Sequence, residues 1–256
     1  MTASEAGQQP VTEPDRLGLH DVPMILMYHG IADVPEDPNS LFVPPERFAE
    51  QMTWMARRKL QGVSIGTLVA AMRAGNHRRM VGITFDDGYT SVLETALPEL
   101  KRHGFTATMF IISDRLDGSN DWDEGPTWKL LGADGVRELA AAGMEIGSHA
   151  ATHPHLAGIA PGELTAEVGG SKASLATVLG SEVRGFAYPY GSMDAAARQA
   201  VRDAGYDYAC AVQTPRSAIG MMALPRIYVG KQDGVARMAA KRFLYRRYIA
   251  LQGRHG

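Results

Sequence analysis

The chain has 256 residues, of which 45% are hydrophobic and 21% are charged, so it is long enough for one large α/β domain with a buried core or for two small domains. A net charge of −2 excludes a broad basic field, and we expect no nucleic acid partner. Cys210 is the single cysteine, which excludes an intramolecular disulfide.

The first 22 residues are polar, with acids interspersed and without an apolar core. This composition predicts a flexible N-terminal arm, residues 1–22, ahead of one catalytic domain over residues 23–256. We find neither a signal peptide pattern nor an apolar run of membrane-spanning length. The expected location is therefore cytoplasmic, or extracytoplasmic if a leader has been removed.

An apolar run over residues 23–29 predicts a buried strand that delivers His29 to its carboxyl end. Residues 31–43 contain acids and prolines and are typical of a surface loop. Proline and an acid at Pro45 and Glu46 then favour the start of a helix. The residues of this helix that we expect in the core are Phe48, Met52 and Met55.

Strands and helices are expected to alternate along the rest of the chain. The predicted strands cover residues 63–65, 80–85, 105–112, 144–148, 185–188, 206–212 and 224–229. The predicted helices cover residues 67–73, 91–103, 135–142, 161–179, 194–204 and about 235–251. Pro98 should kink or divide the second of these helices. The alternation indicates one α/β domain with a mainly parallel sheet, and periodicity alone leaves a barrel and a doubly wound sheet open.

Residues 113–132 interrupt this alternation with Asp, Gly, Asn and Pro around Trp122 and Trp128. A long loop in a compact domain is often functional, and this one could be a lid or a substrate-binding loop. The alternative is a surface excursion whose tryptophans pack back on the body of the domain.

Asp86 and Asp87 directly follow the predicted strand 80–85, in the sequence Thr-Phe-Asp-Asp-Gly. An ordinary Asp-Gly turn is one interpretation of this motif. Adjacent carboxylates repel each other and are costly to bury without a cation. A metal ion on one of them would leave the other free to act as a base.

His149 and His153 follow another predicted strand and are four residues apart. If this segment forms a helical turn, both imidazoles lie on one face and can reach one ion. Neutral imidazole suits zinc and related divalent ions. With Asp87 the two histidines would make a three-ligand site that keeps an open position for water.

A third motif, Phe-Ala-Tyr-Pro-Tyr-Gly at residues 186–191, completes a recognisable set. With the motifs at residues 84–88 and 149–154, the chain resembles the polysaccharide deacetylases with a NodB homology domain, carbohydrate esterase family 4, over roughly residues 23–230. The early strand ending at His29 is similar to that of a permuted subgroup, the exopolysaccharide poly-N-acetylglucosamine deacetylases. This resemblance implies a single deformed (β/α)7-type barrel, NodB-like.

The same resemblance implies a metal-dependent hydrolase that removes N-acetyl groups from an amino sugar, with an N-acetylated carbohydrate as substrate. The implied metal is divalent, foremost zinc, with cobalt, nickel or manganese as alternatives. The family's late Leu-x-His motif is absent near the C-terminus, and the strand ending at His29 supplies a similar one. The implied roles are general base for Asp86, general acid for His29, oxyanion donor for the backbone N–H of Tyr190, and metal ligands for Asp87, His149 and His153.

Besides the missing Leu-x-His motif, two residues depart from the family pattern. Ala150 stands where relatives usually have serine or threonine, and we expect little effect on metal ligation. Ala187 stands where the family usually has an arginine that holds the catalytic aspartate. Arg226, in the late segment Leu-Pro-Arg-Ile at residues 224–227, could reach Asp86 instead. An ordinary ion pair elsewhere is the alternative role of Arg226.

Two other functions stay open from the sequence. One is a related amidohydrolase or O-acetyl esterase acting on another small substrate. The other is an inactive carbohydrate-binding relative, which the retained Asp86 argues against. For the basic C-terminal helix we expect an outer helix with a solvated face, and contact with a membrane surface is the less favoured alternative.

Overall fold

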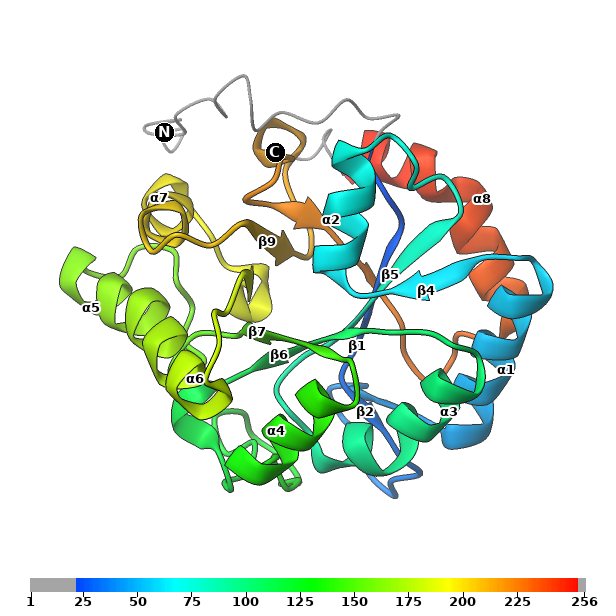
Figure 1. Ribbon diagram of the computed structural model, residues 1–256, viewed down its shortest axis with the longest axis horizontal. Coiled ribbons are helices and arrows are strands. Elements are labelled where there is room, and N and C mark those ends of the chain that lie inside the picture. The colour runs from blue at the N-terminus through cyan, green and yellow to red at the C-terminus, as the bar shows by residue number, and fades with distance from the viewer. Residues whose placement is uncertain (1–21, 253–256) are drawn as a thin grey trace, which may run out of the picture.

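The computed structural model of the protein describes residues 22–252. The predicted arm falls outside this range except for its last residue, Val22, which is buried. The described chain forms strands in the centre with helices arranged around them (Figure 1).

All paired strands are parallel, and most belong to one curved sheet. Its order is β10-β9-β8-β7-β6-β5-β1-β11. The strands are β1 (Ile25–Tyr28), β5 (Met80–Phe85), β6 (Thr108–Ile111), β7 (Glu145–Ser148), β8 (Gly185–Ala187), β9 (Tyr208–Ala211), β10 (Leu224–Pro225) and β11 (Ile227–Tyr228). Alternation of these strands with helices confirms the predicted single α/β domain.

The sheet nearly closes into a barrel at Arg226. β10 pairs with β9 at one edge and β11 pairs with β1 at the other, and Arg226 is the one residue between them. The predicted continuous strand 224–229 is therefore wrong, because the chain changes neighbours at this residue. If β10 and β11 are counted as halves of one bent strand, the closed path has the seven strands of the expected (β/α)7 barrel.

Two further pairings lie outside this path. β4 (Gln61–Val63) pairs with the first half of β5. β2 (Gly30–Ile31) and β3 (Phe42–Val43) form a separate parallel pair. The predicted surface loop over residues 31–43 is thus wrong at its ends, because Ile31, Phe42 and Val43 are apolar and buried.

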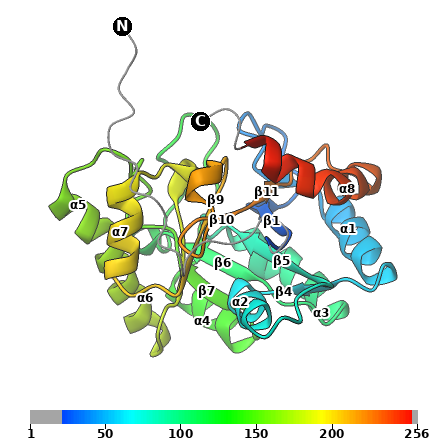
Figure 2. The same ribbon diagram turned by 90° about the horizontal axis from the view of Figure 1, so that it is seen from above.

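The helices mostly cover the outside of the sheet (Figures 1 and 2). They are α1 (Pro45–Arg57), α2 (Ile65–Arg73), α3 (Leu97–Arg102), α4 (Ala133–Ala141), α5 (Pro161–Thr165), α6 (Ser171–Leu179), α7 (Ala195–Asp203) and α8 (Val235–Gln252). Among residues 22–252, no helix combines the length and the apolar character needed to cross a membrane.

α2 closes the amino-terminal end of the barrel. The predicted strand 63–65 is wrong beyond Val63, since the Ser64 side chain caps α2 by accepting a hydrogen bond from the backbone N–H of Thr67. Apolar residues of α2 form one buried cluster with residues of the strands, namely Ile25, Phe110, Ala187, Tyr208, Cys210 and Leu224. α2 does not cover the carboxyl-terminal end of the barrel, where a functional site can therefore form.

Two predicted helices contain a π-helical turn. The helix over residues 91–103 divides into η2 (Val92–Ala96) and α3, with the backbone N–H of Leu97 bonded to the carbonyl of Val92. Pro98 lies in the first turn of α3, where its missing N–H costs little. The helix over residues 161–179 is α5, the π turn η4 (Ala166–Gly170) and α6 in succession.

The C-terminal helix α8 lies beside α1 in both views (Figures 1 and 2). Among its described side chains, residues 235–245, Met238 and Tyr245 are buried, whereas Phe243 is 84% exposed. This arrangement confirms the predicted outer helix. The predicted core residues of α1, Phe48, Met52 and Met55, are all buried.

Candidate active site

The loops at the carboxyl ends of the strands deliver the predicted site residues to one place. Tyr28 of β1 lies opposite Phe85 of β5, so His29 and Asp86 follow at neighbouring positions. A cavity of about 90 Å³ lies at this end of the barrel. All the predicted site residues line it, namely His29, Asp86, Asp87, His149, His153, Tyr190 and Arg226.

Asp87, His149 and His153 form a compact buried cluster. Asp87 Oδ1 lies 3.5 Å from Nε2 of each histidine, and all the potential ligand atoms lie within 4.8 Å of one another. Asp87 Oδ1 is buried and has no hydrogen-bond partner among the described residues. A buried carboxylate oxygen between two imidazole nitrogens is costly by itself and is well suited to a divalent cation. The residues present therefore fit the metal ion that the motifs predicted.

The carbonyl of Ala187 sets the tautomer of His149. Nδ1 of His149 lies 2.8 Å from this oxygen, which can only accept a hydrogen bond, so Nδ1 carries the proton. The lone pair of Nε2 is then directed toward Asp87. This orientation of a histidine by a backbone carbonyl is common in metal sites.

The segment from His149 to His153 is not helical, and the predicted helical turn is wrong. Ala150 and His153 have φ values of 65° and 74°, in the left-handed region. The two imidazole centroids are nevertheless 5.0 Å apart. The irregular loop brings the rings together by a different backbone path from the one that the spacing suggested.

Arg226 forms a two-pronged ion pair with Asp86. Its Nη1 and Nη2 donate to Oδ1 and Oδ2 at 2.6 and 2.7 Å, and Nη1 also donates to the Thr84 hydroxyl at 3.1 Å. Arg226 is 2% exposed, which excludes an ordinary surface pair. The predicted contact with Asp86 is confirmed, and the place of Arg226 at the closure of the barrel explains how a residue far along the chain reaches the centre.

The two adjacent aspartates are electrostatically different. Burial by itself would raise the pKa of Asp86, but the Arg226 guanidinium and His149 lower this pKa to about 2. Burial, with the neighbouring Asp86, raises the pKa of Asp87 well above its usual value. Asp86 is thus held as a carboxylate by Arg226, whereas burial and the neighbouring Asp86 disfavour the charged form of Asp87.

Burial disfavours the protonated form of the three histidines of the site, which are therefore neutral at pH 7. Burial, assisted by His149, lowers the pKa of His153 to about 2, and burial lowers that of His149. Burial also lowers the pKa of His29 to about 4, although Asp86 opposes this change. Neutral imidazoles are the form that binds metal ions. The role of His29 as a general acid stays a prediction, because it requires protonation in the course of a reaction.

Replacing Arg226 with methionine should move the acid limb of the pH profile of kcat/KM to higher pH. A base works only when deprotonated, and the buried carboxyl of Asp86 would have a higher pKa without its cation. The variant should also lose about 3–5 kcal/mol of stability, because a buried charge loses its partner. The pH profile of activity checks this, with Arg226→Lys as a control that keeps the charge. An acid limb that does not move would contradict the assigned pairing.

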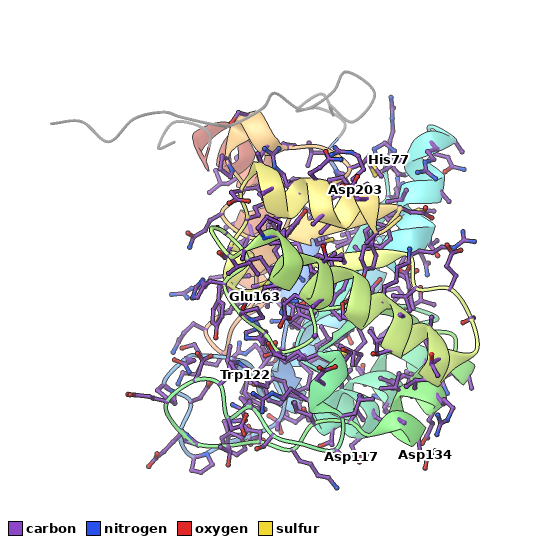
Figure 3. All side chains as sticks on the ribbon, turned by 90° about the vertical axis from the view of Figure 1, so that its left-hand side faces the viewer. His77, Asp117, Trp122, Asp134, Glu163 and Asp203 are labelled. Atoms are coloured by element: carbon purple, nitrogen blue, oxygen red, sulfur yellow. The ribbon has the colours of Figure 1, made fainter. Side chains whose placement is uncertain are left out.

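The insertion over residues 113–132 supplies one wall of the cavity. Trp122 and Asp123 line the cavity, and the centroid of the Trp122 ring lies 4.7 Å from that of the His153 ring. Figure 3 labels Trp122. Trp128 instead packs on Phe42, with ring centroids 5.0 Å apart. Trp128 therefore packs back on the body of the domain, as one interpretation predicts, whereas a role of Trp122 in substrate binding stays a prediction.

Tyr190 forms the opposite wall at the mouth of the cavity. Its ring stacks on His155 at 4.2 Å, and its hydroxyl donates to Asp123 Oδ1 at 2.9 Å. Tyr190 has a φ of 55° in the turn η5 (Pro189–Gly191) that follows β8. His155 is exposed and lies outside the Asp/His cluster.

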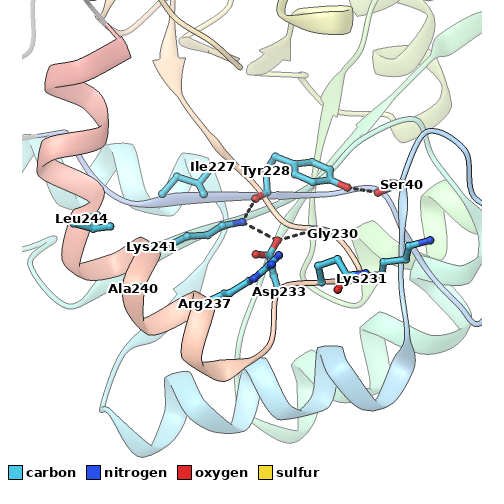
Figure 4. Close-up of a pocket in the computed structure, with 11 residues that line it drawn as sticks. Ser40, Ile227, Tyr228, Gly230, Lys231, Asp233, Arg237, Ala240, Lys241 and Leu244 are labelled. Atoms are coloured by element: carbon cyan, nitrogen blue, oxygen red, sulfur yellow. Dashed lines mark hydrogen bonds and ion pairs between the residues drawn. The ribbon is translucent and has the colours of Figure 1, made fainter.

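A larger cavity of about 600 Å³ lies between α8 and the segment after β11 (Figure 4). Its buried carboxylate, Asp233, accepts a hydrogen bond from Lys241 at 2.7 Å, and Lys241 also donates to the carbonyl of Tyr228. None of the predicted catalytic or metal-ligating residues lines this cavity. The smaller cavity with the Asp/His cluster is therefore the candidate active site.

A family model and a curated relative each match more than half of the chain. A family model described as "Polysaccharide deacetylase" matches residues 73–209, more than half of the chain. The curated "Putative polysaccharide deacetylase YxkH" of Bacillus subtilis (strain 168) is 29% identical over 209 residues, which cover 80% of this chain and 70% of that protein.

Two solved structures share the fold. The Streptococcus pyogenes deacetylase PplD in complex with acetate has a TM-score of 0.73 and 24% identity, over 85% of this chain and 96% of that one. A de-N-acetylase from Aggregatibacter actinomycetemcomitans has a TM-score of 0.72 and 18% identity, over 85% of this chain and 98% of that one.

Proposed function

Because the chain belongs to the polysaccharide deacetylase family, we propose that it is a metal-dependent hydrolase that removes acetyl groups from N-acetylated amino sugars. The observation that carries this proposal is the unpaired Asp87 Oδ1 between His149 and His153, directly beside an ionised Asp86. A carbohydrate-binding relative without activity would not need a second acid that is kept ionised by its own arginine.

Asp87, His149 and His153 would hold the metal ion. When bound there, a divalent ion supplies Lewis acidity toward the acetyl carbonyl and lowers the pKa of water. Two imidazoles and one carboxylate form a donor set that suits zinc, with cobalt, nickel and manganese as alternatives.

The remaining residues would handle the protons and the oxyanion. Asp86 takes a proton from the attacking water, and Arg226 keeps Asp86 ionised and in place. The backbone N–H of Tyr190 donates to the oxyanion of the tetrahedral intermediate. To act as the acid, His29 would first gain a proton and then give it to the amine nitrogen as the C–N bond breaks; the proton that Asp86 takes from water balances this transfer. The products are acetate and a free amino sugar, and one water is consumed.

The size of the cavity favours entry of the acetyl group alone. A volume of about 90 Å³ is far below the roughly 300–1,000 Å³ of pockets that enclose most of a drug-sized ligand. The sugar ring would then remain at the mouth, against Tyr190 and Trp122. We put an amide substrate before an ester because a de-N-acetylase shares the fold; His29 lines the cavity and could protonate either leaving group.

Acetate release from N-acetylglucosamine oligomers tests this proposal. We expect release by the protein with zinc, loss after chelation, and recovery when zinc is restored. A panel with O-acetylated sugars and small N-acetyl amides separates the alternative substrates. Hydrolysis that is equally fast in the chelated protein would overturn the metal-dependent mechanism, and activity on O-acetyl esters alone would overturn the assignment to N-acetyl groups.

A further inference from the structure

We infer that Glu167 is a positioning residue that shapes the metal-ligand segment His149–His153. This inference rests on the metal site of the proposed function, but it concerns metal binding and not the substrate. Glu167 lies in the π turn η4 between α5 and α6 and is 7% exposed. It touches none of the proposed ligands directly, and its position within a long predicted helix gave no sign of a role.

The carboxylate of Glu167 binds the middle of the ligand segment. Oε2 accepts hydrogen bonds from the backbone N–H groups of Ala151 and Thr152, both at 2.9 Å. Oε1 accepts one from the Thr152 hydroxyl at 2.6 Å. Two successive N–H groups that converge on one oxygen form an anion-binding nest, here occupied by a side chain of the same protein. The carboxylate therefore bonds the backbone between the two histidines.

This segment needs outside support because its backbone is strained. Ala150 and His153 are non-glycine residues in the left-handed region, which costs about 1–3 kcal/mol each. Such a conformation persists only where the surroundings hold it. Without Glu167, the N–H groups of Ala151 and Thr152 would lose their acceptor, and relaxation of the backbone would move His153 away from Asp87.

The same helix holds the other end of the segment. Ser171 is four residues after Glu167 and lies on the same face of the helix. Its hydroxyl lies 2.7 Å from that of Ser148, the residue before His149. One helix face thus contacts Ser148, the residue before His149, and Thr152, the residue before His153. A π turn between α5 and α6 at this contact agrees with the frequent occurrence of such turns at functional sites.

Zinc affinity, measured by competition with a chromophoric chelator, tests the inference. Glu167→Ala should weaken zinc binding by about 10–100-fold, the usual effect of losing a partner that orients metal ligands. Glu167→Gln should bind within a few-fold of the wild type, since its amide oxygen can accept from the two N–H groups while the Thr152 hydroxyl turns to accept. Glu163→Ala, an exposed acid one turn earlier in α5, is the matched control and should leave the affinity unchanged (Figure 3).

The visible spectrum of the Co²⁺ form provides a second readout. A purely structural role for Glu167 would lower the melting temperature of the metal-free protein and leave zinc affinity and the Co²⁺ spectrum as in the wild type. That result would overturn the inference. If Glu167→Ala does not fold, Thr152→Val removes one of the three bonds and should weaken zinc binding by about 2–10-fold; wild-type affinity in this variant would also overturn it. Neither readout depends on deacetylation, so failure of the proposed function would be seen separately.

Discussion

Asp86→Asn should retain the metal ion and lose about 10²–10⁴-fold in kcat, the usual contribution of a positioned general base. The amide has the size of the carboxylate but cannot take a proton from water. Because Asp86 is not among the three clustered ligands, zinc should still bind to Asp87, His149 and His153. Metal content and acetate release, measured on the same preparation, check both parts of this expectation.

The asparagine also leaves Arg226 without an anionic partner in a buried position. Some loss of stability is therefore expected, and the circular dichroism and melting temperature of the variant must show that it is folded at the assay temperature. Full activity in a folded, zinc-loaded Asp86→Asn protein would refute the assignment of Asp86 as the base. Loss of the metal together with activity would instead place Asp86 among the ligands.

Asp87→Asn should differ from Asp86→Asn in both respects. It should lose metal binding, and its metal-free form should be more stable than the metal-free wild type. Zinc affinity should fall by at least about 100-fold, since even a change to a residue that orients a ligand costs 10–100-fold. At the same time the variant removes a buried carboxyl that lies beside Asp86 and lacks a hydrogen-bond partner at Oδ1. In the presence of a chelator its melting temperature should exceed that of the wild type, by about 2–4 °C for each kcal/mol gained.

The pH dependence of stability provides the sharpest check. The pKa of Asp87 is raised in the folded protein, so the unfolded chain releases this proton at lower pH. The metal-free wild type should therefore lose stability as pH rises from the ordinary range of an aspartate toward the raised value. This component should be absent from Asp87→Asn. The Asp86 contribution has the opposite sign and lies at lower pH, between about 2 and 3.8, where it is lost on acidification.

Asp134→Asn is a suitable control, because that carboxylate is 98% exposed and lies at the start of α4. It should change neither zinc affinity nor the pH dependence of the melting temperature. If Asp87→Asn is less stable than the wild type in chelator at pH 8, Asp87 is not a charge that awaits a cation, and the metal site must be reconsidered.

Much of the candidate site could be predicted because its residues follow buried strands. In a parallel sheet with helical connections, the carboxyl ends of the strands meet at one edge. His29, Asp86 and His149 come directly after β1, β5 and β7, so their meeting in one cavity follows from local pattern alone. The family match covers residues 73–209 and includes neither His29 nor Arg226, and both nevertheless line that cavity.

The local geometry of the ligand segment was beyond the sequence. Two histidines four residues apart suggested a helical turn, whereas the segment is an irregular loop with two left-handed residues. Its conformation depends on Glu167, whose carboxylate is brought to the loop by the packing of another helix. A contact of this kind has no periodicity, and a sequence pattern therefore does not reveal it.

The amino-acid sequence by itself determined the alternation of strands and helices, the apolar core positions and the types of ligand at the strand ends, because each depends on neighbours within a few residues. Only the tertiary structure decided between a barrel and a doubly wound sheet. That choice depends on a change of pairing partner at Arg226, where the chain stops pairing with β9 and begins to pair with β1. The same change places Arg226 against Asp86, which lies 140 positions earlier in the sequence. Pairing over such a distance depends on how the whole sheet curves and closes, which no local pattern of residues encodes.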